Sequence, residues 1–165
     1  MKTLYIVRHA KSSWDYPHLK DYERPILGTG VKRTKKLIAF FKQKHVKLDY
    51  IVSSHATRAI ETAQLIAKGM DYPSEHIYIS PHIYQADADD ILDVVYALPD
   101  DKNHVLMVGH NPTFTQFANN FLAEKIHFLP TSAVVSISFE TDAWPKITSS
   151  PQLLNFVVFP KNIKL

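Results

Sequence analysis

The chain has 165 residues, of which 45% are hydrophobic and 21% are charged, a composition typical of a folded globular protein. This length suits one core, so we expect a single domain over residues 1–165. The absence of cysteine excludes disulfides, thiolate metal sites and cysteine nucleophiles. A formal net charge of +3 is a mild bias toward anions, not the concentrated basic patch of a nucleic-acid-binding protein.

Hydropathy gives no sign of a membrane or export segment. No apolar run reaches the length of about 18 residues that a membrane-spanning helix needs. The apolar stretch Leu4–Val7 is interrupted at once by Arg8 and His9, and is too short for the core of a signal peptide. We therefore expect a cytoplasmic protein without a membrane partner.

Short β-prone runs alternate with amphipathic segments along the chain. In chain order, the patterns predict a strand at Thr3–Val7, a long loop at Ala10–Gly30, a helix with a basic outer face at Val31–His45, a strand at Asp49–Ser53, a helix from about Arg58 to Ala67, a short strand at His76–Ser80, a helix at Asp87–Leu98, a strand at His104–Val108, a helix at Thr113–Ala123, and strands at Ala133–Phe139 and Leu153–Phe159. This alternation indicates an α/β fold, a three-layer sandwich with a central, mostly parallel sheet flanked by helices.

Three of the predicted strands end on polar side chains. The first is followed by Arg8 and His9, the second ends at the segment Ser53–His55, and the fourth is followed by Gly109 and His110. In open α/β sheets, ligands bind beyond the carboxyl ends of the strands. We therefore expect these polar side chains to meet at one site.

Three segments share the order and spacing of a known set of motifs. Leu4–Ala10 resembles the pattern hydrophobic-hydrophobic-Arg-His-Gly, with Ala10 at the glycine position. Ser53–Ala63 resembles Ser-Ser-x-x-x-Arg-Ala-x-x-Thr-Ala, and Val105–Pro112 resembles a second histidine motif. In this order the segments are similar to the histidine phosphatase superfamily, from the first strand to about Ser138. The small size and the Gly-His-Asn-Pro sequence resemble its short, SixA-like phosphohistidine phosphatase branch, since the larger phosphoglycerate mutases carry insertions.

This resemblance implies a phosphoglycerate mutase-like fold and assigns roles to several residues. It makes His9 the nucleophile that becomes a phosphohistidine, Arg8 and Arg58 the groups that hold the phosphate oxygens, and His110 a further donor. These residue types suit the task, because arginine donates bidentate hydrogen bonds and keeps its charge, and imidazole is nucleophilic near neutral pH. Asp15 falls where many relatives place a phosphate-contacting asparagine.

The general acid is less well defined. Larger relatives supply a glutamate shortly after the third strand, and His82 is the nearest equivalent here. Asp87 and Asp89 are alternatives, although acidic residues also suit the N-terminus of a helix. Because phosphohistidine needs less protonation than an alkyl phosphate ester, a missing glutamate favours phosphohistidine in proteins as the substrate. A small phosphomonoester is the alternative.

Other classes of function remain open. A two-histidine phosphodiesterase would need two His-x-Ser/Thr elements, and His55–Thr57 is the single match. A non-catalytic phosphate-binding module is another alternative, because it would explain the missing glutamate. Nucleic-acid binding is disfavoured, because the lysines of Val31–His45 lack interleaved exposed aromatic residues. No zinc-helix or calcium-loop spacing is present, so we expect no metal and no other cofactor. Nothing in the sequence suggests an obligate oligomer.

Overall fold

The computed structural model describes residues 1–163 and contains a six-stranded sheet with the strand order β3-β2-β4-β1-β5-β6. Its strands are β1 (Lys2–Arg8), β2 (Tyr50–Ser54), β3 (Tyr78–Ser80), β4 (His104–Gly109), β5 (Val134–Phe139) and β6 (Gln152–Val158). β1, β4, β2 and β3 pair in parallel, whereas β5 is antiparallel to both β1 and β6. Within this sheet β5 alone runs against the others, which confirms the prediction of a mostly parallel sheet.

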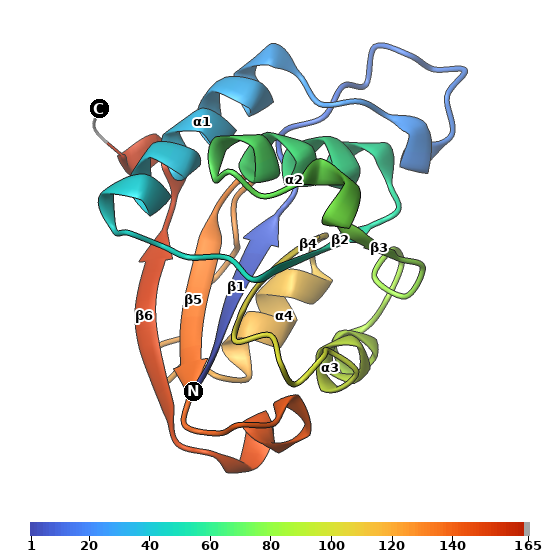
Figure 1. Ribbon diagram of the computed structural model, residues 1–165. Coiled ribbons are helices and arrows are strands. Elements are labelled where there is room, and N and C mark those ends of the chain that lie inside the picture. Colours follow the sequence, from blue (N-terminus) through green and yellow to red (C-terminus); the bar gives the residue numbers. More distant parts are fainter. Residues whose placement is uncertain (164–165) are drawn as a thin grey trace.

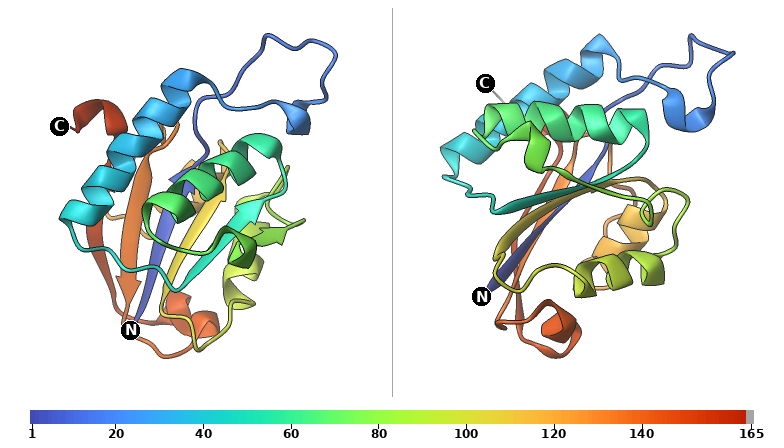
Figure 2. Two further views of the ribbon diagram at one scale, coloured as in Figure 1. Left: turned by 45° about the horizontal axis from the view of Figure 1, so that its top comes forward. Right: turned by 45° about the vertical axis from the view of Figure 1, so that its right-hand side comes forward.

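Helices cover both faces of the sheet. The α-helices are α1 (Gly28–Gln43), α2 (Thr57–Gly69), α3 (Ala88–Tyr96) and α4 (Thr113–Asn119), and the short 3-10 helices are η1 (Asp21–Glu23), η2 (Ser74–His76), η3 (Trp144–Ser149) and η4 (Pro160–Asn162). α1 and α2 lie on one face, and α3 and α4 lie on the other (Figure 1; Figure 2, right). The predicted three-layer α/β sandwich is therefore confirmed.

The alternation of side chains along the strands divides the core into two halves. In β1, Leu4 and Ile6 belong to the cluster beneath α3 and α4, and Tyr5 and Val7 belong to the cluster beneath α1 and α2. All four side chains are buried, as expected for a central strand covered on both faces. This burial explains why β1 has a continuous apolar sequence.

The structure corrects several predicted boundaries. α1 begins at Gly28 rather than Val31, because its first turn packs on the chain just after β1. A Cβ atom on Gly30 would lie 2.6 Å from the carbonyl oxygen of Lys11, so the glycine permits this close approach. α4 ends at Asn119, where the side-chain amide bonds to both backbone groups of Ile126 and turns the chain. Within residues 1–163, no helix combines the length and apolar character needed to cross a membrane.

The register of the central strands places their carboxyl ends side by side. Arg8 at the end of β1 pairs with Gly109 at the end of β4, and Ser53 of β2 pairs with Val108 of β4. The backbone N–H of His9 donates to the carbonyl oxygen of Gly109 at 3.0 Å. The polar segments that follow these three strands are therefore brought to the same edge of the sheet.

Candidate active site

His9 follows β1 directly, and its side chain is buried, with 7% of the residue exposed. Nδ1 lies 2.7 Å from the carbonyl oxygen of Ala10, which can only accept, so Nδ1 carries the proton and Nε2 keeps its lone pair. Burial, reinforced by the charges of Arg58, Arg8 and Arg24, lowers the pKa of His9 to about 3. The ring is therefore neutral at neutral pH, with Nε2 available as a nucleophile.

His110 follows β4, and its ring centroid lies 5.1 Å from that of His9. Its Nε2 lies 2.7 Å from the Ser54 hydroxyl oxygen, which accepts from the backbone N–H of Ala56 at 3.1 Å. Ser54 can donate its hydroxyl proton to Nε2, and in this arrangement the ring proton of His110 lies on Nδ1. Burial, reinforced by the repulsion that would arise if His9 and His110 were both protonated, lowers the pKa of His110 to about 3, so this ring is also neutral.

The two arginines are held by contacts that leave the Nε donor of each unused. Arg8 donates through Nη1 to the carbonyl oxygen of Leu129 at 3.2 Å, and its guanidinium lies 4.9 Å from the Phe128 ring centroid. Arg58 donates through Nη1 and Nη2 to the backbone and carboxylate oxygens of Asp21, at 2.8 and 3.0 Å. The Nε atoms of both arginines are buried.

Three buried nitrogens at this site have no hydrogen-bond partner among the described residues: Arg8 Nε, Arg58 Nε and His110 Nδ1. A buried donor left unpaired costs about 1–3 kcal/mol, so such groups in a folded protein call for an explanation. An anion that accepts from all three would remove this cost. Three of the residues predicted to hold a phosphoryl group therefore have a free buried nitrogen, as do His55 and His104 outside this cavity.

A network around Asp21 was missed by the sequence analysis. The Asp21 carboxylate accepts hydrogen bonds from the Tyr84 hydroxyl at 2.6 Å, from Arg58 at 3.0 Å and from Arg24 Nε at 3.2 Å. Partial burial would raise the pKa of Asp21, but the hydrogen bonds from Tyr84 and Arg58 outweigh it and lower the pKa to about 2. An ionised Asp21 thus ties the loop before α1 to α2 and to the segment after β3.

The two histidines and the two arginines line a cavity of about 600 Å³. Its lining includes the four predicted residues Arg8, His9, Arg58 and His110, together with Asp15 at the rim. It also includes three cations that the sequence analysis did not assign to the site: Lys11, Arg24 and Arg33. The excess of positive charge favours an anionic ligand. Arg24 is buried and its guanidinium stacks on the Trp14 ring at 3.5 Å, so it also stabilises the loop.

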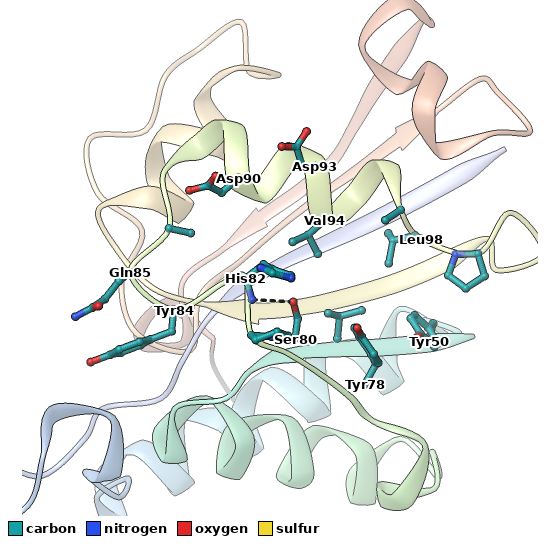
Figure 3. A pocket seen from close by; sticks show the side chains of 15 residues that line it. Tyr50, Tyr78, Ser80, His82, Tyr84, Gln85, Asp90, Asp93, Val94 and Leu98 are labelled. Atoms are coloured by element: carbon teal, nitrogen blue, oxygen red, sulfur yellow. Dashed lines mark hydrogen bonds between the residues drawn. The ribbon is translucent and has the colours of Figure 1, made fainter.

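The structure does not bring His82 to this cavity. His82 is exposed and lines a separate cavity of about 620 Å³ between α3 and the β2–β3 edge, where its backbone N–H donates to the Ser80 hydroxyl (Figure 3). Asp87 is the N-cap of α3 and accepts from the backbone N–H of Asp90 at 2.8 Å. Asp89 is an exposed residue of the first turn of α3, so both aspartates have the helix-terminal placement considered above.

Tyr84 contacts the site from the side that the sequence analysis assigned to His82. It lines both the cavity of Figure 3 and a smaller one, of about 390 Å³, which includes Arg58 and His110. Its ring centroid lies 5.4 Å from that of His110. The segment after β3 thus contributes the hydroxyl of Tyr84, which donates a hydrogen bond to Asp21, rather than an imidazole.

The α/β sandwich thus carries a cation-lined cavity with two neutral histidines at the carboxyl edge of its sheet, an arrangement suited to an anionic ligand. The sequence profile of the histidine phosphatase superfamily (branch 1) matches residues 4–83, which include Arg8, His9 and Arg58. Over these residues the chain is similar to this superfamily, which is a class of phosphatases.

The chain is also similar to individual proteins of a bacterium and a plant. An uncharacterized protein of Mycobacterium leprae is 28% identical over 144 residues, which are 80% of this chain and 86% of that protein. An uncharacterized chloroplastic protein of Arabidopsis thaliana is 26% identical over 147 residues, covering 84% of this chain and 67% of that protein.

Solved structures show the same fold. SixA from Nakamurella multipartitia has a TM-score of 0.81 at 23% identity and covers 96% of both chains. The protein histidine phosphatase SixA complexed with tungstate has a TM-score of 0.81 at 22% identity, covering 98% of this chain and 99% of that chain. A phosphoserine phosphatase from Entamoeba histolytica, in complex with 3-phosphoglyceric acid, has a TM-score of 0.66 at 14% identity, covering 95% and 96%. The fold is thus that of the short, SixA-like form.

Proposed function

We propose that this protein removes the phosphoryl group from phosphohistidine in proteins, through a covalent phosphohistidine on its own His9. The observation that carries the proposal is the set of free buried donors, Arg8 Nε, Arg58 Nε and His110 Nδ1, in the cavity that holds the neutral His9 ring. SixA, whose fold the chain shares, is described as a protein histidine phosphatase.

The chemistry follows from the tautomers of the two histidines. Nε2 of His9 attacks phosphorus, a P–N bond forms, and the bond to the leaving group breaks. As the ring becomes cationic, the Ala10 carbonyl oxygen stabilises the proton on Nδ1. Arg8, Arg58 and the neutral His110 donate to the equatorial oxygens, where negative charge must be stabilised. Water then attacks the phosphohistidine, the P–N bond breaks, phosphate leaves and His9 returns to its neutral state.

The fixed positive charge that phosphoryl transfer requires comes from side chains of the chain itself. Arg8 and Arg58 supply two guanidinium groups at the site, and Lys11 and Arg24 add positive charge around it. We therefore propose a reaction that needs no metal ion and no other cofactor. Arginine suits this task because its planar group matches the geometry of phosphate oxygens.

The leaving group is inferred from the acids near the site. Asp21 is ionised, with a pKa of about 2, and is therefore a poor proton donor at neutral pH. His82 lines another cavity. A substrate whose leaving group departs with little protonation fits this site best, and the imidazole of a phosphohistidine is such a group. An alkyl phosphate ester, which releases a strongly basic alkoxide unless it is protonated, fits less well.

The proposal is tested by comparing three substrates: a phosphohistidine protein, an aryl phosphate and a sugar phosphate. We expect the wild type to prefer the phosphohistidine protein, and His9→Ala to lose activity by more than about a thousandfold, the scale expected when a nucleophile is removed. His82→Ala is the matched control, because it removes a histidine outside the cavity, and it should keep wild-type activity.

Acid quenching separates this mechanism from its alternatives. A phosphoenzyme should be trapped with the wild type and not with His9→Ala, whereas a phosphodiesterase mechanism without a covalent intermediate would give none. Full activity of His9→Ala would refute the nucleophile. Preference for the sugar phosphate would refute the substrate, and binding of phosphate without turnover of any substrate would indicate a non-catalytic module.

A further inference from the structure

The charged residues of the chain are unevenly distributed. Residues 28–47, which form α1 and the turn after it, contain seven cations and no carboxylate: Lys32, Arg33, Lys35, Lys36, Lys42, Lys44 and Lys47. Residues 87–101, which include α3, show the reverse and contain six carboxylates and no cation: Asp87, Asp89, Asp90, Asp93, Asp100 and Asp101. α1 and α3 lie on opposite faces of the sheet, so the molecule has a basic and an acidic side (Figure 2).

The positive charge of α1 is not neutralised within the protein. None of its cations forms an ion pair in the part of the chain that the structure describes. Lys32 and Lys36 are four residues apart and repel each other along the helix surface, as do Arg33 and Lys36 at a spacing of three. These side chains thus destabilise α1, and no contact within the fold explains them.

The first half of α1 adjoins the catalytic cavity. The backbone N–H of Leu27 donates to the carbonyl oxygen of Lys11 at 2.8 Å, and Gly30 packs against the same oxygen. Arg33 and Lys11 both line the cavity that contains His9. We define the basic patch as Lys32, Arg33, Lys35 and Lys36; the first three are exposed and Lys36 is partly exposed. Through Arg33 this patch is continuous with the site of reaction.

The geometry points to an acidic stretch of polypeptide as the ligand of the basic patch, placed next to the phosphorylated histidine of the substrate protein. This inference rests on the proposed function and adds a class of substrate. Complementary charge speeds association and orients the bound partner. The carboxylates around α3 repel the same acidic stretch, so a substrate that enters the cavity is directed toward α1.

The packing of α1 argues against other partners. Its apolar side chains Leu37, Ile38 and Phe41 are buried against the sheet, so none of them is free to enter a lipid layer. The patch contains no aromatic side chain on which a nucleic-acid base could stack. A charged polypeptide segment needs neither feature.

The test uses two phosphohistidine peptides of equal length, one with glutamates and one with lysines around the phosphohistidine. The near variant is Lys32→Glu/Lys35→Glu/Lys36→Glu, which leaves every residue of the catalytic cavity in place. The far variant, Lys42→Glu/Lys44→Glu/Lys47→Glu, is the matched control, because it makes the same change in net charge at the other end of α1. Turnover of para-nitrophenyl phosphate reports whether each variant is folded and competent.

We expect the wild type at low salt to favour the acidic peptide over the basic one by about tenfold in kcat/KM, the lower end of electrostatic enhancement. Added salt should reduce this preference. The near variant should lose or invert it, the far variant should retain most of it, and para-nitrophenyl phosphate turnover should not change. If the near variant fails to turn over para-nitrophenyl phosphate, the three single Lys→Gln variants replace it, each with a partial loss of preference expected.

Three results would overturn the inference. Equal turnover of both peptides by the wild type would refute it while leaving the proposed function intact, as would equal losses in the near and far variants. Loss of binding to single-stranded RNA or to phosphatidylserine vesicles in the near variant, without any peptide preference, would assign the patch to those partners. Turnover of para-nitrophenyl phosphate but of neither peptide would instead refute the proposed function itself.

Discussion

The neutral state of His9 and His110 makes the stability of this protein depend on pH. Both rings have a pKa of about 3 in the folded protein, against an ordinary value of 6.5. Between these values the unfolded chain binds more protons than the folded one, so the free energy of unfolding falls as the pH falls from 6.5 toward 3. Above pH 6.5 both states carry neutral rings, and this contribution disappears.

The size of the effect follows from the same values. One pKa unit corresponds to about 1.4 kcal/mol, so lowering the pH from 7 to 5 destabilises the folded protein by about 2 kcal/mol for each of the two rings. His110→Gln removes one of the two histidine rings. The causes that lower the pKa of His9 stay in place, namely its burial and the charges of Arg58, Arg8 and Arg24. We therefore expect the wild type to lose about 2 kcal/mol more than His110→Gln between pH 7 and pH 5.

Urea unfolding at the two pH values measures this difference, since the midpoint and slope give the free energy of unfolding at each pH. His76→Gln is the control, because it removes an exposed histidine of η2, outside the catalytic cavity. If the wild type and His110→Gln lose equal stability, His110 is not held neutral in the folded protein. The assignment of His110 as a neutral donor would then have to be abandoned.

Two further predictions concern the supports of the site. Asp21→Ala removes the carboxylate that accepts from Arg58 Nη2 and leaves the backbone carbonyl that accepts from Nη1, and we expect a fall in kcat/KM of about ten- to a hundredfold, as is typical for charged hydrogen bonds; Asp101→Ala, at an exposed position, is the control. Gly109→Ala would place a Cβ atom 2.2 Å from the ring of Phe114, so we expect a loss of about 1–3 kcal/mol, measured by thermal unfolding. Wild-type activity of Asp21→Ala would show that Arg58 is oriented without it, and an unchanged Tm of Gly109→Ala would contradict the packing argument.

The sequence by itself determined the layers of the fold and where the site lies. A strand covered on both faces must be apolar throughout, and so Leu4–Val7 could be recognised from its composition alone. The polar residues that end such strands stand out for the same reason. Since parallel strands bring their carboxyl ends to one edge, the order of strands and helices was enough to expect Arg8, His9 and His110 at one site.

Only the tertiary structure decided which atoms of these residues are free and what surrounds them. The Ala10 carbonyl oxygen fixes the tautomer of His9, and the Ser54 hydroxyl is the hydrogen-bond partner of His110; a sequence motif does not contain these contacts. The bond between Tyr84 and Asp21 joins residues 63 positions apart. No periodic pattern links them, because Asp21 lies in the short helix η1 and Tyr84 in a turn, and their positions depend on how α2 and the segment after β3 pack. The position of His82 depends on the same packing. The resemblance to larger relatives predicted His82 close to the site, whereas the structure places it in a different cavity.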